Sequence, residues 1–381
     1  MTVDVAVLRE SWALVSDVSD KVASEFYGLL FSRYPAIRAL FPAMMDAQRD
    51  RLLNALTYVV LHVDDMTTVT RYLRDLARDH RKFDVRPEHY PAIGRCLVAS
   101  MRANARDAWK PEYDEAWLAA YDLIAGVMIQ AAEVDAATSP PYWGARVVAH
   151  EQRTHDIAVL TVEPDQPYPY DPGQYATIQT SRWPRVWRPY SIANAPRRDN
   201  LLTFHVRVVP GGWVSTTLVH RTSVGDQLLL GPPRGVMTLP APRPNRLLCV
   251  AGGTGLAPLK AIIEETLRTS RNPDITLVHG VRLQQELYDG ADLVRLASGP
   301  GRLRLITAVS ADPSHLPSQT AADVVGPLDV LDFPATFVCG PGEMVMAALN
   351  RLAMLGLPSH HIRSEPDVGE FVHRLRVRAP L

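Results

Sequence analysis

The chain has 381 residues, of which 47% are hydrophobic, so it can bury several cores and its length favours two or three domains. Lys and Arg total 40 against 41 Asp and Glu, and this balance gives no electrostatic reason to expect nucleic acid or an anionic membrane as a partner. No basic segment followed by an apolar core opens the chain, and no uninterrupted apolar run approaches the roughly 18 residues that span a bilayer. We therefore expect a cytoplasmic protein with no membrane-spanning segment.

The three cysteines, Cys96, Cys249 and Cys339, are far apart and lack C-x-x-C spacing. This pattern argues against a disulfide framework, a zinc site and a covalently attached haem. A plant-type [2Fe–2S] cluster needs four Cys ligands. With three cysteines, the chain cannot supply the ligands of such a cluster.

Proline spacing predicts the domain boundaries. There are 5 prolines between residues 1 and 133, 15 between 140 and 244, and 11 from 245 onward. A proline-poor stretch favours helices, whereas a proline-dense stretch favours short strands and turns. We therefore predict three domains, at residues 1–138, 142–242 and 245–381.

The first region is predicted to be all helical. Apolar residues recur at helical spacing over 23–34, 52–63 and 69–77, and the third stripe continues onto His80. Periodicity alone leaves a generic helical bundle open, because a histidine on an apolar helix face more often serves packing than metal binding.

The residues around this histidine resemble the globin domain of bacterial flavohaemoglobins, from Phe26-Tyr27 through Leu40-Phe41-Pro42 to Glu88-His89-Tyr90. The resemblance implies a haem with His80 as the proximal iron ligand and Tyr90 near it. It places Tyr27 and Gln48 on the distal side with Leu52 beside them, and Phe41 stacked on the haem. Such an arrangement is chemically coherent, since imidazole ligates iron from one side while hydroxyl and amide donors stabilise bound O2 on the other.

The middle region alternates short β-rich runs with turns, which is typical of an antiparallel β-barrel. The runs are 157–162, 175–179, 202–208 and 227–230, and a further strand carries Arg188-Pro189-Tyr190-Ser191. Arginine offers paired N–H donors to a pyrophosphate. Tyr190 lies on the same strand face as Arg188 and offers a flat surface to a ring, whereas Ser191 points to the other face. A small barrel without a nucleotide is the alternative.

The segment Gly211-Gly212-Trp213-Val214-Ser215 follows after one more strand. Because glycine has no Cβ, its main-chain N–H groups can approach a phosphate closely. The order of these motifs resembles the ferredoxin-reductase family, in which R-x-Y-S holds FAD. The resemblance implies that FAD contacts Tyr175, Arg188, Pro189, Tyr190, Ser191, Gly211, Gly212, Val214 and Ser215.

The third region is predicted to be a doubly wound α/β domain. A short apolar strand at 247–250 leads into Gly252-Gly253-Thr254-Gly255-Leu256-Ala257-Pro258, which opens a helix whose N-terminus suits a pyrophosphate. This turn and Cys339-Gly340-Pro341 together resemble the nicotinamide domain of the same family. The resemblance implies that all residues of these two segments except Leu256 bind the nucleotide. Arg282 suits either a 2′-phosphate or a structural role, so we expect NADH, with NADPH as the alternative.

The three regions together cover essentially the whole chain and resemble flavohaemoglobin. The resemblance implies haem b, FAD and NADH as cofactors, with electrons passing from NADH to FAD to haem. It implies oxidation of NO to nitrate with O2 in a monomeric protein. Two alternatives stay open: a flavohaemoglobin-like reductase with another donor or acceptor, and an O2-binding or redox-sensing haemoprotein.

The sequence departs from the family pattern at four places. Asp79 stands where the family has Lys, and Ala132 stands where it has an acidic residue, with Glu133 next to it. The loop between Phe41 and Gln48 is shorter, and the C-terminal aromatic residue that covers the flavin in the family is missing, since Pro366-Asp367-Val368-Gly369 follows Glu365. In the family, the Lys at the position of Asp79 can meet the Glu at the position of Glu365, which joins the haem and flavin domains. Two carboxylates at these positions would repel each other, so the departures predict slow electron transfer from flavin to haem.

Overall fold

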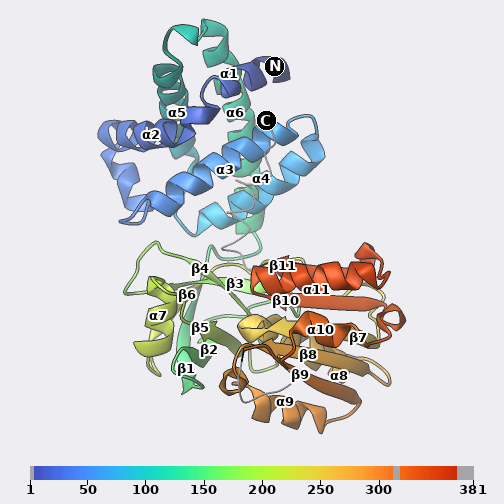
Figure 1. The fold of residues 1–381 in the computed structure, drawn as a ribbon. Coiled ribbons are helices and arrows are strands. Elements are labelled where there is room, and N and C mark those ends of the chain that lie inside the picture. Colours follow the sequence, from blue (N-terminus) through green and yellow to red (C-terminus); the bar gives the residue numbers. More distant parts are fainter. Residues whose placement is uncertain (1–3, 312–317, 367–381) are drawn as a thin grey trace. The chain divides into compact units, whose positions relative to one another are not determined.

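The computed structural model describes residues 4–311 and 318–366 (Figure 1). The chain divides after Tyr142 into two units, each with its own hydrophobic core. The first unit is helical, with α1 Val5–Ala13, α2 Ser19–Arg33, α3 Asp46–His62, α4 Met66–Arg81, α5 Tyr90–Ala105 and α6 Pro111–Ala136.

Local sequence signals account for the ends of these helices. Asp4 and Asp65 accept hydrogen bonds from main-chain N–H groups in the first turns of α1 and α4, as N-caps do. Pro35 follows the end of α2, because proline fits the interior of a helix poorly. Phe26 of α2 and Leu97 of α5 are buried in the core that these helices share.

Helix α6 is long and apolar enough to cross a membrane by length and composition alone. In the structure its side chains Tyr113, Trp117 and Met128 are buried in the cores of the first unit. The indole Nε1 of Trp117 donates a hydrogen bond of 2.8 Å to Ser11 Oγ on α1. These contacts tie one side of α6 into the cores of the first unit, although only 22% of its most apolar window is buried.

The second unit begins with an antiparallel sheet and one helix. Its strands occur in the order β4-β3-β6-β1-β2-β5. Ala193 N donates to Thr203 O at 2.7 Å, and Ile192 bridges Phe204, so the two edges of the sheet meet and nearly close a barrel. The elements are β1 Trp143–Gln152, β2 Ile157–Pro164, β3 Tyr175–Thr180, β4 Arg188–Ser191, β5 Leu202–Arg207, α7 Trp213–His220 and β6 Gln227–Leu230.

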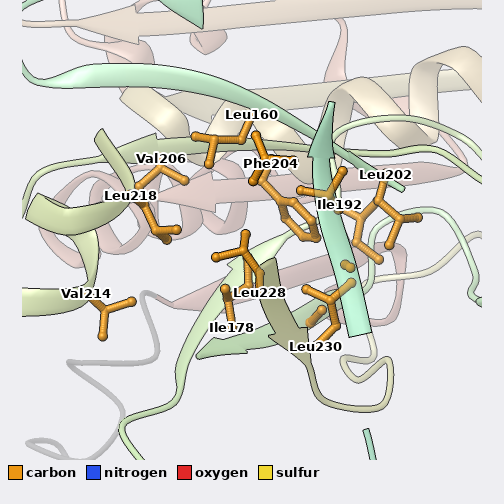
Figure 2. Packing of buried hydrophobic residues seen from close by; sticks show 14 of the residues in the cluster. Leu160, Ile178, Ile192, Leu202, Phe204, Val206, Val214, Leu218, Leu228 and Leu230 are labelled. Carbon is orange, nitrogen blue, oxygen red and sulfur yellow. The ribbon is translucent and has the colours of Figure 1, made fainter. Parts of the chain in front are cut away.

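Figure 2 shows the core of this barrel. Alternate residues of each strand point inward, so that Leu160, Ile178, Phe204 and Leu228 meet although they come from four strands. This packing fixes which face of β5 is left for other contacts: Phe204 and Val206 point inward, and the residue between them, His205, points away.

The remainder of the second unit is a five-stranded parallel sheet in the order β11-β10-β7-β8-β9. Separate clusters of buried residues cover its two faces, one including α8 and α9 and the other α10 and α11, as in a doubly wound fold. The predicted fold class is confirmed: an all-α globin domain, an antiparallel barrel and a doubly wound α/β domain. The elements are β7 Arg246–Gly252, α8 Leu256–Thr269, β8 Asp274–Val281, α9 Gly290–Ala297, β9 Arg302–Val309, α10 Ala321–Val325, β10 Ala335–Gly340, α11 Gly342–Met354 and β11 Ile362–Pro366.

Candidate haem, flavin and nicotinamide sites

The predicted distal residues lie together in the first unit. Tyr27 on α2 is buried, and its hydroxyl donates to the main-chain carbonyl of Gln48 at 3.4 Å. The ring of Tyr27 meets Phe41 edge-on, with centroids 5.5 Å apart, and Leu52 packs against the same core. Burial raises the pKa of Tyr27 above its ordinary value, so its hydroxyl keeps its proton and acts as a donor.

Arg38 holds the short loop that follows Phe41. Its guanidinium donates to the carbonyl oxygens of Phe41 at 3.2 Å and Ala43 at 3.0 Å, and it lies over the ring of Phe31 at 5.2 Å. These contacts hold the main chain at Phe41, whose ring lies beside Tyr27. We did not predict Arg38, since nothing in its sequence neighbourhood distinguishes it from a surface arginine.

The predicted proximal ligand, His80, lies near the end of α4. Its Nδ1 is 2.8 Å from the carbonyl oxygen of Leu76, one turn earlier. A carbonyl only accepts, so Nδ1 carries the proton and the lone pair lies on Nε2. An imidazole with its far nitrogen tied to a carbonyl is the form that ligates metals, so this residue fits the proximal position of a haem.

Tyr90 opens α5 and is buried in the same cluster as Leu73 and Ala77 of α4, the helix that carries His80. Burial raises the pKa of Tyr90 to about 12. Tyr121 of α6 packs closely onto α5: a Cβ at Gly94 would lie 2.6 Å from its ring. Tyr90 is therefore a neutral phenol between α4 and α6, next to the helix of the proposed iron ligand.

Two of the acidic residues near this site, Asp79 and Asp135, have a specific basic partner. Asp79 accepts from the ammonium of Lys82 at 2.6 Å, and the Lys82 side chain is only 2% exposed. Glu133 is exposed, whereas Asp135 of α6 binds the guanidinium of Arg81. Asp79 thus serves as a counter-ion to a buried lysine within the globin unit, a role that its spacing did not predict. The side chain of Glu365 and the segment predicted to lack the flavin-covering aromatic, beyond Pro366, fall outside the described residues.

A cavity of about 270 Å³ in the second unit brings most of the predicted flavin and nicotinamide residues together. Three strands of the barrel line one side, and the turns after β7 and β10 line the other. The predicted residues in its wall are Tyr175, Pro189, Tyr190, Ser191, Gly252, Gly253, Thr254, Gly255, Ala257, Cys339, Gly340 and Pro341. The R-P-Y-S motif precedes the Gly-rich turn by about 60 residues and the C-G-P turn by about 150, yet all three segments line one site.

The other predicted flavin residues lie outside this cavity wall. Arg188 is exposed on β4 and donates to the carbonyl of Trp187 at 3.0 Å. Val214 belongs to the barrel core, and Ser215 Oγ accepts from Val209 N at 3.1 Å at the start of α7, beside Gly211 and Gly212. Pro258 is buried at the start of α8. Their contacts with a dinucleotide stay predictions.

Two glycines in the wall permit a close approach of the turns. A Cβ at Gly255 would lie 2.3 Å from the carbonyl oxygen of Cys339, and one at Gly340, where φ is +155°, would lie 2.8 Å from Gly252 Cα. The Gly-rich turn and the C-G-P turn are therefore in van der Waals contact through their main chains.

Replacing Gly255 with alanine is expected to cost about 1–3 kcal/mol of unfolding free energy, because the added methyl group has to displace main-chain atoms. It should also weaken NADH binding. Gly290→Ala is the matched control, since no atom lies within 4 Å of the added Cβ. Denaturant unfolding and an NADH titration measure both effects, and equal losses in the two variants would contradict this account.

Four cavity residues were missed by the sequence reasoning: His205, Arg207, Val208 and Val209. Strand alternation could have identified the first two, since they occupy the face of β5 opposite the barrel core. Arg207 is held by Asp156 at 2.8 Å and by Glu286 at 2.5 Å, so it links β5 to the α/β part.

Comparison with known proteins agrees with this geometry. Family models match three consecutive parts of the chain: Globin at residues 24–128, Oxidoreductase FAD-binding domain at 144–238 and Oxidoreductase NAD-binding domain at 249–350. The ferredoxin--NAD(P)(+) reductase component of the naphthalene 1,2-dioxygenase system of Pseudomonas putida is 36% identical over 223 residues, covering 58% of this chain and 67% of that protein.

Two relatives cover the chain from end to end. A flavohemoprotein of Pseudomonas putida is 27% identical over 390 residues, covering 94% of this chain and 96% of that protein. The flavohemoglobin of Malassezia yamatoensis, solved with bound FAD and heme, has the same fold, with a TM-score of 0.73 at 20% identity over 96% of this chain and 99% of that chain. Haem, FAD and a nicotinamide dinucleotide are therefore its cofactors, and the chain belongs to the flavohaemoglobin family, in which a globin is joined to a ferredoxin-reductase-type module.

Proposed function

We propose that this oxidoreductase uses NADH to reduce FAD, passes the electrons to haem and oxidises NO to nitrate with O2. The observation that carries the proposal is the combination, in one chain, of a metal-binding tautomer at His80 with a cavity in which the flavin and nicotinamide motifs meet. We also propose that the protein is monomeric and cytoplasmic, with O2 and NO as its small-molecule partners.

The residues divide the work between the two units. In the second unit, Tyr190 offers a ring face to the flavin, and the main chain at 252–255 receives the nicotinamide dinucleotide. In the first unit, His80 would hold the haem through Nε2, Phe41 would pack on it, and the Tyr27 hydroxyl would donate a hydrogen bond on the distal side. FAD supplies the change from two-electron to one-electron transfer, and haem supplies the site at which O2 and NO react.

The electron balance gives a direct test. One NO, one O2 and one electron make one nitrate ion, so each NADH, a two-electron donor, supports the formation of two nitrate ions. Purified protein supplied with NADH, O2 and NO together should consume NADH and release nitrate in this ratio. A redox sensor would consume NADH negligibly under the same conditions, and that outcome would overturn the proposal.

A second candidate function is an NADH-driven reductase for another electron acceptor. The observation in its favour is that the reductase part is 36% identical to a ferredoxin reductase component, whereas the whole chain is 27% identical to a flavohemoprotein. If NADH reduces the flavin rapidly while haem stays oxidised, and an added ferredoxin is reduced instead, this second function is the correct one.

Tyr27→Phe tests the distal assignment. The substitution removes a hydroxyl donor but keeps the ring that packs on Phe41. A hydrogen bond to a charged acceptor is worth about 1.5–3 kcal/mol, so O2 should dissociate from the ferrous protein at least about tenfold faster. Tyr34→Phe is the control, since the Tyr34 hydroxyl is paired with Arg95. An unchanged O2 dissociation rate in Tyr27→Phe would place this hydroxyl away from the ligand.

A further inference from the structure

His205 is a buried polar residue in the wall of the flavin and nicotinamide cavity. It lies on β5 between Phe204 and Val206, which point into the barrel, so its own side chain points toward the α/β part. The residue is 4% exposed. It shares the cavity wall with Tyr190 of the flavin motif and Cys339 of the nicotinamide motif.

Tyr288, from the loop before α9, holds the imidazole in place. Its hydroxyl oxygen is 2.7 Å from Nδ1 of His205, and the two rings meet edge-on with centroids 5.3 Å apart. Nε2 of His205 is buried and has no hydrogen-bond partner among the residues that the structure describes. One ring nitrogen is thus fixed by the protein, and the other is not satisfied by it.

The chemistry of the pair identifies Nε2 as a donor. Burial, with Lys260 and Arg153 adding to it, keeps the pKa of His205 well below its ordinary value, so the ring is neutral. The Tyr288 hydroxyl makes no other hydrogen bond within the described part of the chain, and Oδ1 of the adjacent Asp289 is itself unpartnered. The Tyr288 hydroxyl therefore donates its proton to Nδ1 of His205, and the proton of the imidazole ring is on Nε2.

We infer that Nε2–H of His205, set by the Tyr288 hydroxyl, donates a hydrogen bond to a carbonyl oxygen of a redox ring bound in this cavity. The shared ligand chemistry is an amide-type carbonyl, which both the flavin ring and the nicotinamide carboxamide carry. A neutral single donor suits such an oxygen, whereas a phosphate is better served by charged groups and by main-chain amides at the glycine-rich turn. His205 is then a positioning residue for hydride transfer. The inference rests on the assignment of this cavity to FAD and NADH.

The test compares His205→Leu, which removes the donor at similar size, with His205→Gln, which keeps an N–H near the position of Nε2. FAD is titrated into the full-length apoprotein and followed by flavin fluorescence, and NAD+ is then titrated into the FAD-loaded protein. If the flavin carbonyl is the acceptor, His205→Leu should raise the FAD dissociation constant about fivefold or more and shift the flavin absorption bands. If the carboxamide is the acceptor, FAD binding should be unchanged and the NAD+ dissociation constant should rise by a similar factor. His205→Gln should recover most of either loss.

Thr180→Val is the matched control, because Thr180 Oγ1 is also buried and unpartnered in the barrel but lies outside the cavity wall. It should leave both dissociation constants unchanged. If His205→Leu does not fold, Tyr288→Phe decides, since it frees Nδ1 and should weaken the same dinucleotide at least about twofold. Dissociation constants for FAD and NAD+ that stay within about twofold in the folded variants would overturn the inference. Neither titration uses NO, so a failure of the proposed NO chemistry would leave this result readable.

Discussion

Replacing His80 with alanine is expected to remove the Soret band of the purified, haem-supplemented protein while the flavin bands stay. The reason is the family resemblance together with the geometry at α4: Nδ1 of His80 donates to Leu76 O, so the lone pair that iron coordination requires lies on Nε2. FAD should stay bound because the flavin motif belongs to the second unit, which has its own core. Visible spectra of the two proteins at equal flavin absorbance measure the effect.

The chain offers a close control for this experiment. His62 on α3 has the same local geometry, with Nδ1 2.9 Å from the carbonyl oxygen of Tyr58 four residues earlier, and it stacks on the Tyr58 ring. His62→Ala should keep the Soret band, because this tautomer permits ligation without causing it: the family resemblance places the proximal ligand at His80, on the helix that packs against Tyr90. A Soret band that survives in His80→Ala but disappears in His62→Ala would show that His62, and not His80, is the haem ligand. A flavin spectrum without any Soret band in the unmodified protein would reject the haem site as a whole.

Local sequence signals predicted the elements, because the patterns that set them are short. The proline-poor region is helical, and the strand predicted at 202–208 is β5 at Leu202–Arg207. The R-P-Y-S, Gly-rich and C-G-P segments were also predicted, and the fold places most of them in one cavity wall. Each of these segments carries its own information, so its identification does not require knowledge of its neighbours in space.

Contacts between distant residues could not be predicted in the same way. His205 and Tyr288 are 83 positions apart and belong to different parts of the second unit, so only the fold brings the imidazole and the hydroxyl together. Asp79 shows the opposite limit. Its partner, Lys82, is only three residues away, yet the prediction paired Asp79 with the distant Glu365. The sequence does not reveal that Lys82 is buried, because tertiary packing sets its burial. The exposure of charged side chains, rather than their spacing in the sequence, decides which ion pairs matter for the structure.

Lys260→Met is expected to cost about 3–5 kcal/mol of unfolding free energy in the second unit at pH 8, because it removes one partner of a buried ion pair. Lys260 on α8 donates to Asp289 Oδ2 at 2.7 Å and lies 3.7 Å from Asp292 Oδ2. Asp289 is 0% exposed, and its Oδ1 has no hydrogen-bond partner among the residues that the structure describes. Without the ammonium, the carboxylate would have to stay charged in an apolar environment or take up a proton. Denaturant unfolding, followed by the rise in flavin fluorescence as FAD is released, measures the change.

The cost should depend on pH in a direction that the pKa of Asp289 fixes. Burial raises this pKa to about 6, above the ordinary aspartate value of 3.8, even with Lys260 present. The folded state therefore binds the proton more tightly than the unfolded state, so this group lowers stability as pH rises through about 4 to 6. Loss of Lys260 raises the pKa of Asp289 in the folded state further, so the pH range over which stability falls extends to higher pH. The penalty of Lys260→Met should thus be smaller at pH 5 than at pH 8.

Two further variants separate the buried pair from general charge effects. Arg146→Met removes one partner of the exposed pair Arg146–Glu163, whose side chains are 51% and 47% exposed, and should cost less than about 1 kcal/mol at either pH. The double variant Lys260→Met/Asp289→Leu should recover most of the loss, since replacing both members of a buried pair with apolar groups is often neutral. A single-variant cost near that of Arg146→Met, or one that does not change between pH 5 and pH 8, would show that Asp289 does not carry a buried charge.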